Sequence, residues 1–366
     1  MFLPVLLVRD LGFWSWVAFA TPNVLGAAAM GWVLRRGETS ARMVQAHRPA
    51  CDLFSLVTIA FHVHFVTWLG PRLIGAYAPV LFALLLAAFW FAGLRNDRRD
   101  LVTAVAVSLL SLLLLALVGL EEAASVARLP QGWNPQLTYV LPVFLLGFLA
   151  CPYLDMTFHR ARQDLSRPAA RWAFSLGFGG VFLLMIAGTL LYSALLAELS
   201  LPIDEPLALG LPIVAALAIH LLMQGAFTSA VHLRELLHNE PAAARLTMMR
   251  LGLVVMLTLL VQLLHRRGWV EIPGMDHGEA VYRYFLTFYG LVFPAYVWIC
   301  LLPMGGGSWQ PPSRAQVWIC VATILLALPW YALAFLRGQY VWLLLGVGLV
   351  LLARWPAWWW ERRARA

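Results

Sequence analysis

The sequence predicts an all-α protein, a polytopic transmembrane helix bundle of about eleven spans. Hydrophobic residues make up 62% of the chain and charged residues only 12%, whereas an average soluble domain is about half apolar and about a quarter charged. A soluble protein of this length could not cover its surface with so few charges. In a bilayer the lipid solvates the apolar side chains instead. The seventeen tryptophans and ten tyrosines agree, since both residues favour the level of the lipid headgroups.

Apolar runs long enough to cross about 30 Å of hydrocarbon recur along the whole chain. We expect membrane-spanning helices at residues 11–34, 52–70, 75–94, 101–120, 138–158, 172–197, 207–231, 246–264, 281–302, 315–336 and 339–353. The segments between these runs are short, so residues 1–366 are expected to form a single transmembrane domain. The first ten residues are expected to be retained, because their charges follow an apolar stretch instead of preceding it.

The arginines predict the orientation of the bundle. All 26 basic residues are arginine, and 19 of them lie in alternate connections: residues 35–50, 95–100, 159–171 and 232–250, Arg314, and the tail after 353. The positive-inside rule then places the N-terminus outside and the C-terminus in the cytoplasm. Because these arginines lie in short loops, the net charge of +8 does not indicate that the protein binds nucleic acid. We expect an integral protein of a bacterial cytoplasmic (inner) membrane whose partner is the lipid bilayer, with no protein partner assigned.

Polar residues inside hydrocarbon are costly and are therefore candidates for function. The strongest group follows Pro152, whose missing N–H predicts a kink or break in the helix. Tyr153, Asp155 and His159 come directly after it. Asp155 and His159 are four residues apart, so they share a helix face and could exchange a proton. The alternative is that the helix ends here, with Asp155 a solvated partner of His159 and the neighbouring arginines.

The seventh span, at 207–231, carries a second polar group. His220, Gln224, Thr228 and His232 recur every four residues, which predicts one polar stripe that drifts about 40° per step. Such a stripe is expected to face the bundle interior or water. The alternative is a set of hydrogen bonds that merely hold the helices together.

The second span, at 52–70, carries a third group. Asp52, Ser55 and His62 are compatible with one face, whereas His64 points elsewhere. The alternative is an interfacial Asp52 with a structurally bonded histidine.

The first span holds the fourth candidate, Asn23. Thr21, Pro22 and Asn23 are expected to interrupt this span, and the small residues from Gly26 to Gly31 predict a close approach of another helix.

No cofactor and no metal are expected. Cys51, Cys151, Cys300 and Cys320 lie in or beside apolar segments with no CxxC spacing, so we interpret them as small apolar residues. Haem needs paired histidines on facing helices, and no second helix repeats the spacing of His220 and His232. No dinucleotide-binding, phosphate-binding or hydrolase motif is present.

The segment CPYLDMTFHRARQDLSRPAARWAFSLGFGGVFLLMIAGTLLY, which starts at Cys151, resembles one region of the sodium:solute symporters of LeuT-like fold. In that family a broken helix runs from outside to inside, ends in a polar stretch and is followed by an apolar helix. The resemblance implies that Tyr153, Asp155 and the neighbouring break line a substrate path. The family has two inverted five-helix repeats, and here only four spans precede 138–158.

Three functions remain open. The first is a secondary transporter, or a degenerate relative of one, that moves a small solute or ion by alternating access around Pro152, with proton coupling through Asp155 or His220. The second is a non-catalytic membrane scaffold subunit. The third is an intramembrane enzyme resembling the membrane acyltransferases, whose entry helix is similar to the helix that contains His62. That family also needs an arginine about three turns earlier, where this chain has Cys51 and Asp52.

Overall fold

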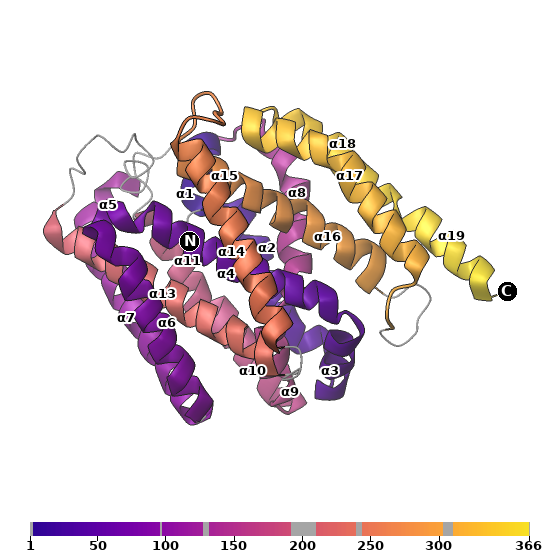
Figure 1. Cartoon of the computed structure of the whole chain (residues 1–366), viewed down its shortest axis with the longest axis horizontal. Helices are drawn as coiled ribbons and strands as arrows, with labels where there is room; N and C mark the ends of the chain where they lie inside the picture. The colour runs from indigo at the N-terminus through magenta and orange to yellow at the C-terminus, as the bar shows by residue number, and fades with distance from the viewer. Residues whose placement is uncertain are drawn as a thin grey trace. The chain divides into compact units, whose positions relative to one another are not determined.

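The computed structural model describes residues 3–95, 97–126, 132–191, 210–238, 244–302 and 310–365. Within these ranges the chain is all-helical and contains no strand, as the composition predicts (Figure 1). The helices up to residue 126 are α1 (Leu3–Leu11), α2 (Phe13–Val33), α3 (Gly37–Ala46), α4 (Arg48–Trp68), α5 (Gly70–Ile74), η1 (Gly75–Tyr77), α6 (Ala78–Arg95) and α7 (Asp97–Val126). The next are α8 (Leu137–Ala150), η2 (Cys151–Leu154), α9 (Met156–Gln163), α10 (Arg167–Leu176), η3 (Gly177–Phe182) and α11 (Leu183–Leu191). The last are α13 (Leu211–His238), α14 (Ala244–Arg266), α15 (His277–Thr287), η5 (Phe288–Val292), α16 (Phe293–Tyr296), η6 (Val297–Leu301), α17 (Arg314–Arg337), η7 (Tyr340–Trp342), α18 (Leu343–Leu352) and α19 (Arg354–Arg365).

Ten helical segments of the described residues are long and apolar enough to cross a membrane. The predicted spans 52–70 and 75–94 fall together in one segment of 46 residues, Arg48–Gly93. That segment contains two helices, α4 and α6, because the chain turns at Gly75, whose φ of 67° suits a residue without Cβ. Residues 192–197 and 207–209, the ends of two predicted spans, lie outside the described residues.

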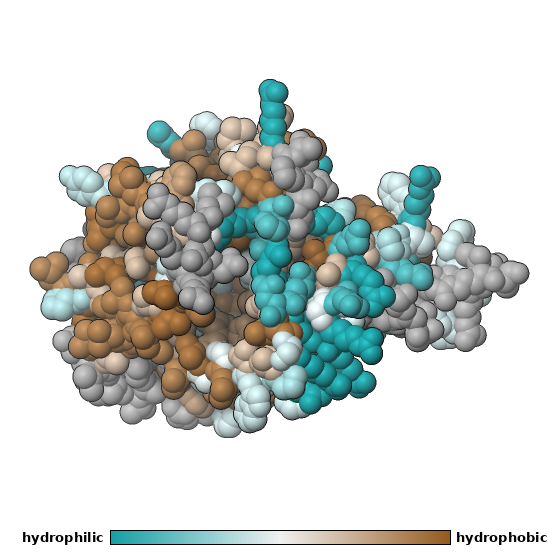
Figure 2. All heavy atoms as spheres, turned by 90° about the horizontal axis from the view of Figure 1, so that it is seen from below, coloured by the Kyte–Doolittle hydropathy of each residue, from teal (hydrophilic) through white to brown (hydrophobic). Residues whose placement is uncertain are grey.

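Large hydrophobic side chains cover much of the described surface. Leu84, Phe91, Leu109, Leu325 and Leu326 are each more than 60% exposed. In the face drawn in Figure 2, brown hydrophobic residues form broad continuous areas. A soluble monomer rarely exposes apolar areas of this kind, whereas lipid chains solvate them. The structure therefore supports a multi-pass membrane protein.

Contacts group the residues into two compact units. Unit 1 comprises Met1–Trp16, Ser55–Gly132 and Val181–Tyr282, and unit 2 comprises Val17–Phe54, Trp133–Gly180 and Arg283–Ala366. The helices α2, α4 and α15 each continue from one unit into the other.

Unit 1 is built around α13, which packs against α5, α6 and α7 (Figure 1). Its core contains Val66, Ala78, Phe82, Leu222 and Ala226, from α4, α6 and α13. α11 packs against α7 and also against α1.

Unit 2 contains the close helix contact that the small residues of the first span predict. A Cβ added to Gly26 of α2 would lie 2.2 Å from the carbonyl oxygen of Phe148 in α8, and one added to Gly31 would lie 2.7 Å from that of Ala170 in α10. The expected interruption near Asn23 is wrong, since α2 continues through Pro22. A proline removes one N–H and bends a helix, but neighbouring helices can hold the remaining turns together. Asn23 is half-buried on this continuous helix.

The same unit contains α17, which packs against α18 (Figure 1). Local sequence defines both ends of α17. Ser313 and Gln316 form a capping box at its start, and Gly338 ends it in the left-handed conformation.

Candidate functional site

Two of the three predicted polar helices meet in unit 1. His232 of α13 and Ser55 of α4 form a hydrogen bond of 3.1 Å between Nδ1 and Oγ, and both side chains are buried. About two turns further along α4, His62 donates from Nδ1 to the carbonyl of Thr58 at 2.8 Å. We call Ser55, His62, Gly225 and His232 the α4–α13 seam.

Gly225 leaves room for the side chain of His62 between α4 and α13. A Cβ at this position would lie 3.5 Å from Cδ2 of His62 and 3.3 Å from Cε2 of Phe82 in α6. His62 also interacts electrostatically with His232. Since the Nδ1 proton of His62 is held by a carbonyl, its Nε2 is the acceptor of the neutral ring. The seam therefore places two histidines from facing helices where each influences the charge of the other.

Gln224 of α13 reaches a different helix. Gln224 donates from Nε2 to Ser111 Oγ of α7 at 2.7 Å, and Thr228 is half-buried one turn later. The predicted single stripe thus serves two neighbours, because each four-residue step turns the side chain by about 40°. His220 lies further along α13, and its Nδ1 is buried without a hydrogen-bond partner among the described residues.

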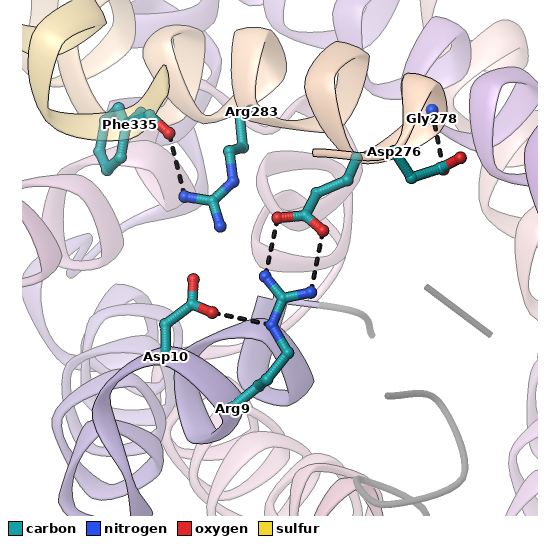
Figure 3. A network of polar contacts seen from close by, with 7 residues as sticks. Arg9, Asp10, Asp276, Gly278, Arg283 and Phe335 are labelled. Carbon is teal, nitrogen blue, oxygen red and sulfur yellow. Dashed lines mark hydrogen bonds and ion pairs between the residues drawn. The ribbon is translucent and has the colours of Figure 1, made fainter. Parts of the chain in front are cut away.

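A second polar group of unit 1 surrounds Asp276, just before α15. Its Oδ2 accepts from the indole Nε1 of Trp68 at 2.7 Å and from the backbone N–H of Gly278 at 3.0 Å, and its Oδ1 lies 2.8 Å from Nδ1 of His277 (Figure 3 draws the bond to Gly278). Burial acts to raise the pKa of Asp276, but these partners hold it below the ordinary value. His64 donates from Nε2 to the carbonyl of Gly278 at 3.1 Å. It therefore lies on another face of α4 than His62, as the sequence predicts.

Arg9 extends this group to α1. Its two terminal nitrogens bind both carboxylate oxygens of Glu279 at 2.8 and 2.9 Å, and its Nε lies 2.8 Å from Asp10 (Figure 3). Burial acts to lower the pKa of Arg9, but the bonds to Glu279 and Asp10 raise it above the usual range. We call Arg9, Trp68, Asp276 and Glu279 the Asp276 network.

Sequence reasoning missed the Asp276 network. Residues 265–280 lie between the expected spans 246–264 and 281–302, and none of the predicted polar groups includes them. A local signal was present, because an Asp with a Glu three residues later, directly before an apolar run, is typical of a helix start. The partners of these acids, Trp68 and Arg9, lie 208 and 270 residues away and carry no such signal.

The predicted break at Pro152 lies in unit 2. α8 ends at Ala150, a 3₁₀ turn follows, and Asp155 has an extended backbone before α9 begins. Asp155 is buried and caps α9, since its Oδ1 accepts from the N–H of Thr157 at 2.8 Å and from its hydroxyl at 2.7 Å. Pro152 is buried and Tyr153 is half-buried.

His159 has other partners. Its Nε2 donates to the carbonyl of Tyr153 at 3.0 Å, and its Nδ1 lies 2.7 Å from the hydroxyl of Ser40 in α3. Burial lowers the pKa of His159, so the ring is neutral, with a proton on Nε2 and an acceptor at Nδ1. Arg162, also buried, donates to the carbonyls of Leu34 and Leu165. The bond between Ser40 and His159 joins α3 to α9, and the bond from His159 satisfies the carbonyl of Tyr153 in the break.

No family model, no curated protein and no solved structure matches this chain. Within the described ranges, no group of three or more His, Cys, Asp or Glu residues is placed to hold a metal ion.

Proposed function

We propose that this multi-pass membrane protein is a secondary transporter that carries a small solute across the bilayer, with the α4–α13 seam as its polar path. The observation that carries the proposal is the pairing of His232 with Ser55 on facing apolar helices, beside His62. Ionisable groups at such positions typically mark solute paths or proton relays in membrane proteins.

Proton coupling fits the seam better than sodium coupling. A histidine titrates near neutral pH, and protonation of either ring would repel the other and replace an accepted hydrogen bond by a donated one. A sodium site needs several oxygen ligands, and the seam offers the hydroxyl of Ser55.

The proposal includes eleven crossings with the N-terminus outside. Counting α4 and α6 separately turns the ten apolar segments into eleven. Segments predicted on one side also contact one another. In unit 1 the external segments that contain Arg9 and Asp276 both join the Asp276 network, and in unit 2 the cytoplasmic segments that contain Ser40 and His159 meet. These contacts support the placing of each pair of segments on one side of the membrane, on which the arginine-based orientation depends.

The resemblance to the sodium:solute symporters enters here as part of the proposal. It is supported by the break after Pro152, because non-helical backbone at membrane depth is tolerated only where protein or water covers it. The break would then be a hinge for alternating access.

Uptake into proteoliposomes tests the proposal. Purified protein is reconstituted and supplied with radiolabelled amino acids, monosaccharides, nucleosides and monocarboxylates, with and without an inward proton gradient. We expect gradient-dependent uptake of one class, strongly reduced in His62→Ala and His232→Ala. Ser175→Ala serves as the control, because it removes only the exposed partner of Trp32. Absence of uptake of every class by stable, monodisperse protein would overturn the proposal.

The charge of Asp155 is tested in the same assay. Asp155→Asn keeps a capping oxygen for Thr157 and removes only the charge. Unchanged uptake with unchanged pH dependence would exclude Asp155 as the coupling residue and leave the seam as the site of coupling.

A membrane scaffold is the second candidate, favoured by the hydrogen bond between Gln224 and Ser111. Bonds of this kind hold membrane helices together without any transport. A scaffold would retain its fold in His232→Ala and show no uptake in any variant.

A further inference from the structure

Two helices of unit 2 begin beside one buried arginine. Arg162, in the last turn of α9, is 1% exposed. Its Nε donates to the carbonyl of Leu34, just before α3, and its Nη1 donates at 3.0 Å to the carbonyl of Leu165, just before α10. A Cβ added to Gly37 of α3 would lie 2.9 Å from the carbonyl oxygen of Gln163, so the two chain segments are in contact. The guanidinium of Arg162 therefore lies between the starts of α3 and α10.

The charge of Arg162 is not balanced within the part of the chain that the structure describes. No carboxylate pairs with Arg162 there, and its third nitrogen, Nη2, is buried without a hydrogen-bond partner. Burial, and then the nearby charge of Arg167, lower the pKa of Arg162. Since a buried cation is normally paired with an anion, this arrangement favours an anion from outside the chain as the partner.

Both helix starts offer free backbone N–H groups. The N-cap of α3 is Arg36 and that of α10 is Ser166, and neither side chain accepts a hydrogen bond from the first turn of its helix. By contrast, Ser313 and Gln316 form the capping box that satisfies the start of α17. Uncapped N–H groups and the helix dipole attract an anion to a helix N-terminus. Two such starts at one place can together hold an anion that has several oxygens.

Further arginines flank these helix starts. Arg35 and Arg36 precede α3, Arg167 is the first residue of α10, and all three are exposed. A cation at a helix N-terminus is unfavourable, so helix stability does not explain these positions. The neighbouring acids, Glu38 and Asp164, are exposed and form no ion pair within the described ranges. The positive charge at the two helix starts is therefore largely uncompensated.

The helices beside these arginines expose large apolar side chains. At the end of α2 and on α10, four of them are each more than 50% exposed: Trp32, Val33, Trp172 and Leu176. Both helices belong to segments apolar enough to cross a membrane, so these side chains contact lipid chains. The guanidinium of Arg171 lies 4.6 Å from the ring centre of Trp32, and its Nε is buried without a hydrogen-bond partner among the described residues. An anion bound here thus has lipid chains next to it, which favours a phospholipid over a free anion.

We propose that the starts of α3 and α10 bind the phosphate group of an anionic phospholipid. The phosphate oxygens accept from the backbone N–H groups of the two helix starts and from Nη2 of Arg162. The exposed side chains of Arg36 and Arg167 neutralise the remaining charge, and the lipid chains lie along α2 and α10. A phosphatidylcholine binds less tightly, because its choline cation is repelled by these arginines. This inference is independent of the transport proposal.

Native mass spectrometry of the full-length protein, released from detergent, tests the site. The probes are dioleoylphosphatidylglycerol and, with the same lipid chains, dioleoylphosphatidylcholine. We expect one phosphatidylglycerol to bind at least about tenfold more tightly than phosphatidylcholine, which is the effect of a single charge-assisted hydrogen bond. Millimolar inorganic phosphate should not displace it. Equal binding of the two lipids, or displacement of the lipid by inorganic phosphate, would overturn the proposal.

Variants locate the bound lipid. The double variant Arg36→Gln, Arg167→Gln changes only exposed side chains and should weaken phosphatidylglycerol binding by about tenfold. Arg314→Gln is the matched control, because it changes an exposed arginine at the start of a capped helix, and its affinity should stay unchanged. An unchanged affinity in the double variant, or an equal loss in Arg314→Gln, would overturn the site.

Arg162→Met tests the buried charge through a second measurement. Phosphatidylglycerol is expected to raise the melting temperature of the wild-type protein, because a ligand that binds only the folded state stabilises it. In Arg162→Met this rise should be lost, whatever the melting temperature without lipid. A rise as large as that of the wild type would remove Arg162 from the site.

Discussion

Two kinds of polar contact hold distant segments together, pairs of side chains and side chains bonded to backbone carbonyls. Unit 1 pairs side chains from different helices, as in Arg9 with Glu279 and His232 with Ser55. Unit 2 directs long side chains at backbone carbonyls, as in Arg162 with Leu34, and Arg283 with Phe335 at 2.9 Å (Figure 3). Side-chain pairs can exchange partners when a proton or a solute binds, whereas a backbone carbonyl stays with its helix. We infer that the pairs Arg9–Glu279 and His232–Ser55 of unit 1 are switchable contacts, whereas the bonds of Arg162 and Arg283 to carbonyls of unit 2 are fixed ones.

The largest effect is expected from glycines at helix contacts. Gly26→Ala in unit 2 puts a methyl group 2.2 Å from a backbone oxygen that cannot move alone, so we expect a loss of about 3 kcal/mol of stability. Gly225→Ala in unit 1 meets only the side chains of His62 and Phe82, at 3.3 Å or more, and should lose less than about 1 kcal/mol. Tryptophan fluorescence during thermal unfolding in detergent measures both. Equal losses of stability in Gly26→Ala and Gly225→Ala would contradict the expected difference between the two helix contacts.

The next effect concerns charged partners. Glu279→Gln removes the negative charge that partners Arg9. Because Arg9 is one-third exposed, water screens part of this effect, and we expect a loss of about 1–3 kcal/mol of folding stability. The double variant Arg9→Met, Glu279→Leu should regain most of it, since both polar groups are then gone. Arg162→Met leaves the backbone carbonyls of Leu34 and Leu165 without their donor. No second substitution can remove a backbone carbonyl, so we expect a loss of about 2 kcal/mol of stability that cannot be regained. Melting temperatures of the three variants check these losses. A double variant that stays as unstable as Glu279→Gln would contradict the pairing of Arg9 with Glu279.

Acidification is expected to destabilise the folded protein through His47 of unit 2 before it does so through Asp276 of unit 1. The folded-state pKa of His47 is lowered to about 4, so between about pH 6.5 and 4 the unfolded chain binds the proton and the folded chain does not. The contribution of His47 to the free energy of unfolding is therefore fully present above about pH 6.5. Below that pH the free energy of unfolding falls by at most about 1.4 kcal/mol per pH unit. Asp276, whose pKa is also lowered, contributes stability that is lost only below about pH 4.

Melting temperatures from pH 7 to 3 separate these two groups. His47→Gln should flatten the upper part of the curve, and Asp276→Asn should flatten only the part below about pH 4. An unchanged slope above pH 4 in His47→Gln would show that His47 does not carry the acid sensitivity.

The smallest effect is expected at a neutral pair of unit 1. Gln224→Leu removes the hydrogen bond to Ser111, and interhelical bonds of this kind are worth about 0.6 kcal/mol on average in membranes. Ser111→Ala should give a similar change, and the double variant no further loss. A loss above about 2 kcal/mol would mean that this pair, and not the Asp276 network, carries the stability of unit 1.

Local properties of the sequence were enough to predict several features. Runs of apolar residues predicted the all-helical membrane protein, Pro152 predicted a break, and Gly26 and Gly31 predicted a close helix contact. Each depends on the residue itself or on neighbours within a few turns. The expected interruption at Asn23 was wrong for the same reason, since the helices around α2 decide whether a proline bends it or ends it.

The sequence by itself determined that the chain enters a membrane as helices, because burying apolar side chains in lipid needs no specific partner. Its arginine pattern predicts an orientation with the N-terminus outside. Only the tertiary structure decided which polar groups meet: His232 with Ser55, and Arg9 with Glu279. Such partners depend on how each helix is rotated and shifted against its neighbours, and that is set by side-chain packing between segments far apart in the chain.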